Sequence, residues 1–166
     1  MTAVYPGSFD PITNGHVDII ERSCSIFNKV IVAVAINSEK AGLFTPEERV
    51  EIIKETFKGN PKIEVVHFKG LLINYVKDHN IKVIIRGLRA VSDFEYEFQM
   101  ALMNKKLWKD VETVFMMSSE NNMYVSSRIV KEIFSLGGCV KDLVPDNVRK
   151  RLEEKFKSLK KTGRNR

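Results

Sequence analysis

Residues 4–16 read V-Y-P-G-S-F-D-P-I-T-N-G-H, and this stretch predicts the fold more directly than any other part of the chain. A short apolar strand runs into a Pro/Gly turn, the Ser8 hydroxyl follows, and Thr13 and Asn14 are residue types that begin helices. Gly15 and His16 then fall in the first helical turn. The N-terminus of a helix offers unpaired N–H groups to anions, and a histidine beside it adds a further polar contact. The stretch therefore predicts a phosphate site between a strand and a helix.

Strand and helix patterns alternate along the rest of the chain. The segment 30–36 holds no polar residue, as expected for a parallel strand covered on both faces. We therefore expect an α/β fold: a single Rossmann-like, doubly wound domain with a five-stranded parallel sheet and helices on both faces. The patterns predict strands at 3–5, 30–36, 63–68, 81–85 and 112–117, and helices at 15–27, 45–57, 71–79, 92–106, 126–136 and 145–157.

The composition is that of an ordinary globular protein, with 43% hydrophobic residues and no apolar run long enough to span a bilayer. The net charge of +6 is concentrated at the end: residues 149–166 carry +7 and the remaining 148 residues carry −1. We expect one domain over residues 1–159 and a disordered basic tail over 160–166, in a cytoplasmic protein without a signal peptide or a disulfide framework. The near-neutral body favours no nucleic-acid or membrane partner, although a basic nucleic-acid-binding module remains an alternative.

Polar residues that follow predicted strands are the candidates for a site, because ligands of a parallel sheet bind beyond the carboxyl ends of its strands. Lys40 follows the second strand, Arg86-Gly87-Leu88-Arg89 follows the fourth, and Tyr124-Val125-Ser126-Ser127-Arg128 opens a helix after the fifth. The two arginines offer fixed donors to phosphate oxygens. Each candidate also has a structural alternative. These are a solvated loop for Lys40, ion pairs with the acids at 93–97 for the arginines, helix capping for the serines, and a surface position for His16.

The candidate residues all favour anions, and none of them stands out as a base or a nucleophile. The chain lacks the G-x-x-x-x-G-K-[ST] loop, the G-x-G-x-x-G turn, the G-x-S-x-G elbow and any Cys/His/carboxylate spacing typical of a metal site. This inventory suits phosphoryl or nucleotidyl transfer to an acceptor that is itself a phosphate, with a second pKa of about 6. Such an acceptor needs no general base, and Mg²⁺ would be bound mainly by the nucleotide phosphates and water, without protein side chains as ligands.

Four motifs together resemble the phosphopantetheine adenylyltransferase family of the T-x-G-H nucleotidyltransferase superfamily. They are P-G-S-F-D-P-I-T-N-G-H at 6–16, F-T-P-E-E-R at 44–49, R-G-L-R-A-V-S-D-F-E-Y-E at 86–97 and Y-V-S-S-R-I-V-K-E at 124–132. The resemblance implies transfer of AMP from ATP to 4′-phosphopantetheine, giving 3′-dephospho-coenzyme A and pyrophosphate, the penultimate step of coenzyme A biosynthesis. It also implies a cytoplasmic homohexamer that coenzyme A inhibits. The alternative within the superfamily is another small-molecule transferase, such as nicotinate-mononucleotide adenylyltransferase or a cytidylyltransferase.

The resemblance also implies roles for individual residues. His16 would stabilise the transition state at the α-phosphate, and Lys40, Leu72 and Arg86, with Ser8, would hold phosphopantetheine. The chain departs from the family pattern at three positions: Ser8 stands for a common threonine, Asn122 for a common aromatic residue, and Arg128 for a serine. The residues implied for ATP are Ser8, Phe9, His16, Gly87, Leu88, Arg89, Glu97, Asn122, Met123, Tyr124, Val125, Ser126, Ser127 and Arg128.

Overall fold

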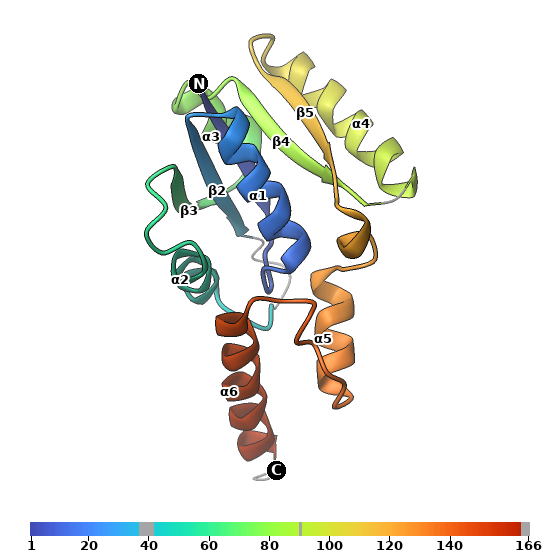
Figure 1. Ribbon diagram of the computed structural model, residues 1–166. Helices are drawn as coiled ribbons and strands as arrows, with labels where there is room; N and C mark the ends of the chain where they lie inside the picture. The colour runs from blue at the N-terminus through green and yellow to red at the C-terminus, as the bar shows by residue number, and fades with distance from the viewer. Residues whose placement is uncertain (37–41, 90, 164–166) are drawn as a thin grey trace.

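A parallel five-stranded sheet forms the centre of the protein in the computed structural model, which describes residues 1–36, 42–89 and 91–163 (Figure 1). Within these residues the strand order is β3-β2-β1-β4-β5, and every neighbouring pair is parallel. The predicted fold class is confirmed. The strands are β1 (Thr2–Gly7), β2 (Lys29–Ile36), β3 (Ile63–Lys69), β4 (Val83–Leu88) and β5 (Glu112–Met117).

Helices cover both faces of the sheet because alternate strand residues belong to two separate apolar cores. Val30, Val32 and Val34 of β2 belong to the larger core, whereas Ile31 and Ala33 belong to the smaller one. The larger core takes side chains from α1, α2, α5 and α6, and the smaller core takes them from α3. The helices are α1 (Asn14–Ile26), α2 (Pro46–Thr56), α3 (Leu72–Asp78), α4 (Val91–Leu107), α5 (Ser127–Ser135) and α6 (Asp146–Gly163), with a 3₁₀ turn at Glu120–Asn122.

Strand β4 continues three residues beyond the predicted end at Ile85. Arg86, Gly87 and Leu88 pair with Phe115, Met116 and Met117 of β5, so the parallel ladder holds this polar stretch in the strand. The prediction that Arg86-Gly87-Leu88 follows the strand is therefore wrong, and Arg89 is the first residue after it.

Helix α6 is also longer than predicted, because it runs to Gly163 where the sequence pattern placed its end at Lys157. Lysine and arginine are good helix formers, so the basic stretch extends the helix once its first turns are packed. Val148 and Leu152 are buried and Phe156 meets Phe134 of α5 with ring centroids 5.1 Å apart. Residues 160–163, expected in a disordered tail, are helical, and 164–166 lie outside the described residues.

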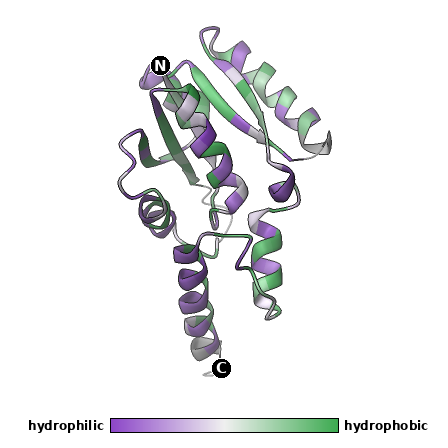
Figure 2. Cartoon of the chain, viewed as in Figure 1, coloured by the Kyte–Doolittle hydropathy of each residue, from purple (hydrophilic) through white to green (hydrophobic). Residues whose placement is uncertain are grey.

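Figure 2 colours the chain by hydropathy: the strands are largely apolar, and α6 is largely hydrophilic. Across the described ranges, no helix is both long and apolar enough to cross a membrane.

The order of the strands determines where the site lies. The chain moves from β1 outward to β2 and β3, then returns to place β4 on the other side of β1. The carboxyl ends of β1 and β4 therefore meet at the switch point of the sheet, where ligands of such folds bind.

Candidate active site

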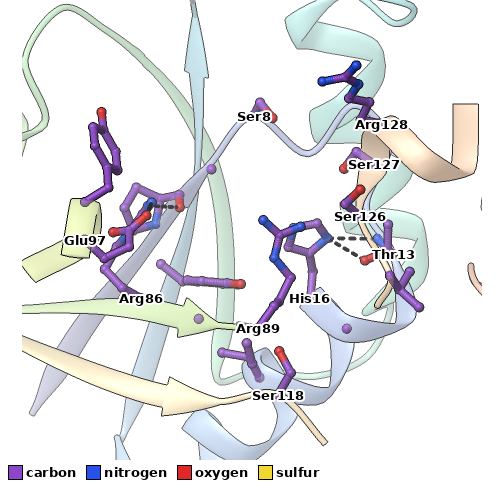
Figure 3. A pocket seen from close by; sticks show the side chains of 18 residues that line it. Ser8, Thr13, His16, Arg86, Arg89, Glu97, Ser118, Ser126, Ser127 and Arg128 are labelled. Carbon is purple, nitrogen blue, oxygen red and sulfur yellow. Dashed lines mark hydrogen bonds and ion pairs between the residues drawn. The ribbon is translucent and has the colours of Figure 1, made fainter. Parts of the chain in front are cut away.

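A cavity of about 580 Å³ opens at the carboxyl ends of β1 and β4 (Figure 3). Its walls come from the turn after β1, the first turn of α1, the end of β4, the start of α4 and the N-terminus of α5. The lining includes most of the residues that the sequence pattern singled out, although these lie far apart in the chain. The lining residues are Tyr5, Pro6, Gly7, Ser8, Thr13, Gly15, His16, Ile19, Arg86, Gly87, Arg89, Tyr96, Glu97, Ser118, Val125, Ser126, Ser127 and Arg128.

The protonation of His16 is fixed by the start of its own helix. Thr13 is the N-cap of α1, and its backbone N–H donates to His16 Nδ1 at 3.0 Å, while the Thr13 hydroxyl lies 2.9 Å from the same nitrogen. Because Nδ1 accepts a hydrogen bond, the neutral ring carries its proton on Nε2. Burial, joined by Arg89 and Arg86, lowers the pKa of His16 to about 4. His16 is therefore a neutral N–H donor at neutral pH.

Phe9 fixes the face of the His16 ring and does not line the cavity. Its own side chain is buried, and its ring meets that of His16 edge-on with centroids 5.1 Å apart. The residue adopts a positive φ of 45°, which turns the ring back under the loop. Gly7 is required beneath it, since a Cβ there would stand 2.8 Å from Phe9 Cζ. The Phe9 side chain is therefore directed away from the cavity, and the backbone contact with a nucleotide that the resemblance implies stays a prediction.

Arg86 lies in an ion pair with Glu97, as the structural alternative predicted. Its Nε and Nη2 donate to the two carboxylate oxygens at 2.6 and 2.5 Å, and Nη1 donates to the Pro6 carbonyl at 2.9 Å. Burial by itself lowers the pKa of Arg86, but Glu97 outweighs it and raises that pKa above its usual range. The pair holds the guanidinium rigidly in the wall of the cavity, so the structural role and a ligand contact are compatible.

The N-terminus of α5 forms the wall opposite β4. Ser126 caps the helix by accepting the Ile129 N–H at 3.2 Å, and Ser127 donates to the Pro11 carbonyl at 2.7 Å. The second bond fastens α5 to the turn that leads into α1. Arg128 is exposed and lines the cavity next to both serines. The capping alternative is thus confirmed for Ser126, and the first residues of α5 still line the cavity, where a helix N-terminus favours anions.

Besides Phe9 and Leu72, four of the described residues in the prediction do not line this cavity. Leu88 is buried. Asn122, Met123 and Tyr124 belong to or follow the 3₁₀ turn, where Asn122 Nδ2 donates to Ser119 Oγ at 2.8 Å. Lys40 lies outside the described residues. The roles of these residues toward a ligand stay predictions.

Leu72 lines a second, smaller cavity of about 110 Å³ beside the first. The two cavities share Arg86, Tyr96 and Glu97, so they adjoin along β4 and α4. Met100 and Ala101 contribute apolar surface to the smaller cavity, which Asn104 and Thr113 complete. The arrangement places a polar chamber beside a smaller, mostly apolar one.

Asp10 organises the loops around the cavity, and the sequence analysis did not identify it. Its carboxylate accepts the N–H groups of Leu43 and Phe44, each at 2.9 Å, and the Lys131 ammonium at 2.7 Å. Arg49 completes the network: its Nε lies 3.5 Å from the carboxylate, and its Nη1 donates to the Ser8 carbonyl at 3.1 Å. Burial alone raises the pKa of Asp10, but these hydrogen bonds outweigh it and lower that pKa. The sequence did carry a signal for this role, because Asp10 is an acidic residue between the apolar residues Phe9 and Pro11.

Fold and site together define a nucleotidyltransferase of the α/β class. The family model described as cytidylyltransferase-like matches residues 4–133. Phosphopantetheine adenylyltransferase of Dictyoglomus thermophilum is 56% identical over 154 residues, which are 93% of this chain and 94% of that protein. The enzyme of the same name from Geotalea daltonii is 59% identical over 93% of this chain and 96% of its own, and that from Clostridium tetani is 58% identical over 88% and 91%. The chain belongs to the phosphopantetheine adenylyltransferase family.

Proposed function

We propose that this protein transfers the adenylyl group of ATP to 4′-phosphopantetheine, giving 3′-dephospho-coenzyme A and pyrophosphate. The observation that carries the proposal is the neutral His16, held with its Nε2 proton available in a cavity lined by arginines and helix N-termini. The printed names of the relatives support the choice of substrates. The chemistry of the cavity supports the reaction class independently of those names.

The cavity stabilises charge and lacks an available base. Glu97 is its one carboxylate among the described lining residues, and Arg86 occupies both of its oxygens. A phosphate acceptor needs no base, because its oxygen is already ionised at neutral pH. That oxygen attacks the α-phosphorus, the bond from the α-phosphorus to the bridging oxygen breaks, and pyrophosphate leaves with the electron pair. His16 Nε2–H donates to the α-phosphate oxygens, which become more basic in the transition state.

The second cavity supports phosphopantetheine as the acceptor. Arg86 lies where the polar chamber meets the smaller, mostly apolar chamber, so it would hold the acceptor phosphate at that junction. The uncharged pantetheine arm then extends past Leu72. Lys40 is the second cation that we assign to this phosphate, on the strength of the family resemblance.

Mg²⁺ enters the reaction as part of its nucleotide substrate. Among the described residues, no three His, Cys, Asp or Glu side chains gather to bind a metal ion. A divalent ion held by phosphates and water needs no such group, and it neutralises the leaving pyrophosphate.

Self-association is also proposed, because α4 exposes apolar side chains on more than one side. Phe94, Tyr96, Phe98, Leu102 and Met103 are each at least 44% exposed, which is unusual for a helix of a monomeric protein. The family resemblance gives the number of subunits as six and the cellular location as the cytoplasm. Light scattering coupled to gel filtration measures the subunit number directly.

Coenzyme A is the proposed feedback inhibitor. It contains both the adenylyl and the pantetheine portions of the two substrates, so one molecule can occupy both cavities. Inhibition should therefore be competitive with each substrate.

A pyrophosphate-release assay with ATP and a panel of acceptors tests the proposed function. We expect turnover with 4′-phosphopantetheine and none with nicotinate mononucleotide, because nicotinate mononucleotide has no pantetheine arm to occupy the smaller cavity. Turnover with nicotinate mononucleotide alone would replace the proposed function with the alternative transferase. Omitting Mg²⁺ in the same assay should abolish release.

A further inference from the structure

The hydroxyl of Ser118 is a buried polar group that the reaction described above does not use. Ser118 directly follows β5 and is 8% exposed, and its Oγ has no hydrogen-bond partner among the residues that the structure describes. The residue lines the main cavity, and Figure 3 shows its oxygen directed toward the side occupied by Arg89 and His16. Buried hydroxyls in folded proteins almost always have a partner. A group that bonds this oxygen when the cavity is filled would explain the exception.

The backbone around Ser118 is held firmly on both sides. The Ser118 N–H donates to the Leu88 carbonyl at 3.0 Å, which continues the ladder between β5 and β4. The preceding carbonyl, of Met117, accepts from Arg22 at 2.7 Å, and the following N–H, of Ser119, donates to Asp18 at 3.2 Å. Rotation about a single side-chain bond is therefore the main freedom left to the hydroxyl. A rigidly placed donor and acceptor is what a binding site needs to orient a ligand.

The surroundings of Ser118 are suited to an uncharged ligand group. Its partner Leu88 is next to Gly87, and a Cβ on Gly87 would stand 2.4 Å from Ile19 Cδ1 and 3.2 Å from the Tyr5 hydroxyl oxygen, so this end of the cavity is walled by an aliphatic side chain and a phenol. In Figure 3, Ser8 and Ser118 lie at opposite ends of the view, with Arg89 and His16 between them. Ser127 and Arg128, which suit phosphate oxygens, lie toward Ser8 in the same view, so the end of the cavity at Ser118 is left for another part of the nucleotide.

We propose that Ser118 is a further ATP-binding residue, whose hydroxyl hydrogen-bonds an uncharged polar atom of the nucleoside. The inference rests on the proposed function, because that function places ATP in this cavity. Base and ribose both carry suitable atoms, and two nucleotide analogues distinguish them. The hydroxyl does not touch the reacting phosphorus, so its contribution is to affinity and to the choice of nucleotide.

The test measures the dissociation constants of ATP and of tripolyphosphate by calorimetry for the wild type, Ser118→Ala, Ser118→Thr and Ser25→Ala. Ser25 is the control, because it is exposed, its hydroxyl donates to the Arg22 carbonyl at 2.7 Å, and it does not line the cavity. We expect Ser118→Ala to weaken ATP binding about three- to tenfold, the range for one neutral hydrogen bond, and to leave tripolyphosphate binding unchanged. Ser118→Thr should retain most of the affinity, and Ser25→Ala should retain all of it.

The thermal midpoint of the ligand-free protein separates binding from folding. Removing an unpartnered hydroxyl should leave this midpoint unchanged or raise it, so a weakened affinity with an undiminished midpoint supports the proposal. A loss for 2′-deoxyATP smaller than that for ATP identifies the ribose as the partner, and a smaller loss for purine riboside triphosphate identifies the exocyclic amine. An affinity change under twofold, or an equal loss for tripolyphosphate, overturns the proposal. Failure of the wild type to bind ATP would instead reject the proposed function.

Discussion

The Asp10 network makes a quantitative prediction about stability. Replacing Asp10 by asparagine keeps the shape of the side chain but leaves one oxygen to serve two backbone N–H groups, and it removes the charge that faces Lys131 and Arg49. Breaking one partner of a buried ion pair typically costs 3–5 kcal/mol, so we expect about 3 kcal/mol for this nearly isosteric change. For a chain of this size, the loss corresponds to a fall of about 6–12 °C in Tm.

The pH dependence of that loss gives the sharper measurement. The pKa of Asp10 is lowered in the folded state, so the stabilisation is fully present above the unfolded pKa of about 3.9 and disappears as the pH falls through the folded pKa. Urea titrations from pH 7 to pH 3 should show a wild-type advantage over Asp10→Asn that is constant above about pH 5 and shrinks below about pH 4. Taking the difference between the two proteins cancels the titration of the other groups.

The exposed pair of Glu55 and Arg151, 3.6 Å apart, supplies the matched control. Glu55→Gln should cost less than about 1 kcal/mol, because solvent screens a surface ion pair. A loss below about 1 kcal/mol for Asp10→Asn, or a loss that stays constant down to pH 3, would refute the reasoning, since either result means that the ionised carboxylate does not hold the loops together.

Three further predictions concern the site and the tail. His16→Ala should lower kcat about 10²- to 10³-fold while changing the ATP dissociation constant little, and a mutant that loses affinity alone would make His16 a binding residue. The pKa of about 4 keeps His16 neutral, so any ionisation near 6 in the steady-state rates from pH 6 to pH 9 should come from the acceptor phosphate and persist in His16→Gln; an ionisation near 6.5 that His16→Gln removes would contradict the neutral state of His16. Truncation after Leu159 removes the basic end, exposed at Lys160, and should leave adenylyl transfer nearly intact, whereas a large loss would give that segment a role in the reaction.

The sequence predicted the fold class because its apolar patterns are long and alternate regularly. The strand 30–36 has no polar side chain, and Thr45-Pro46-Glu47-Glu48 marks the start of α2 within one residue. Local chemistry of this kind acts within a few residues, so it can be read without the tertiary structure. The same local chemistry placed Thr13 and Ser126 at helix starts, where both residues are N-caps in the structure.

Where local sequence signals were weak, tertiary contacts determined the ends of elements and the roles of residues. The end of β4 could not be read from R-G-L-R, because its pairing partner lies some thirty residues away in β5. Asp10 looked like an ordinary loop acid, and its importance comes from Lys131 and Arg49, which the fold brings to it from different helices. Ser118 was likewise an ordinary serine until the cavity was seen to surround it.

By itself, the sequence determined the class of fold, the candidate residues for an anion site near the ends of the strands, and the family that their motifs resemble. The tertiary structure alone decided which of these residues share one cavity, which nitrogen of His16 carries the proton, and that Arg86 is held by Glu97. The physical reason is the range of the forces involved. Helix starts and strand patterns depend on neighbours along the chain, whereas a pKa, a tautomer and a cavity depend on groups that only folding brings together.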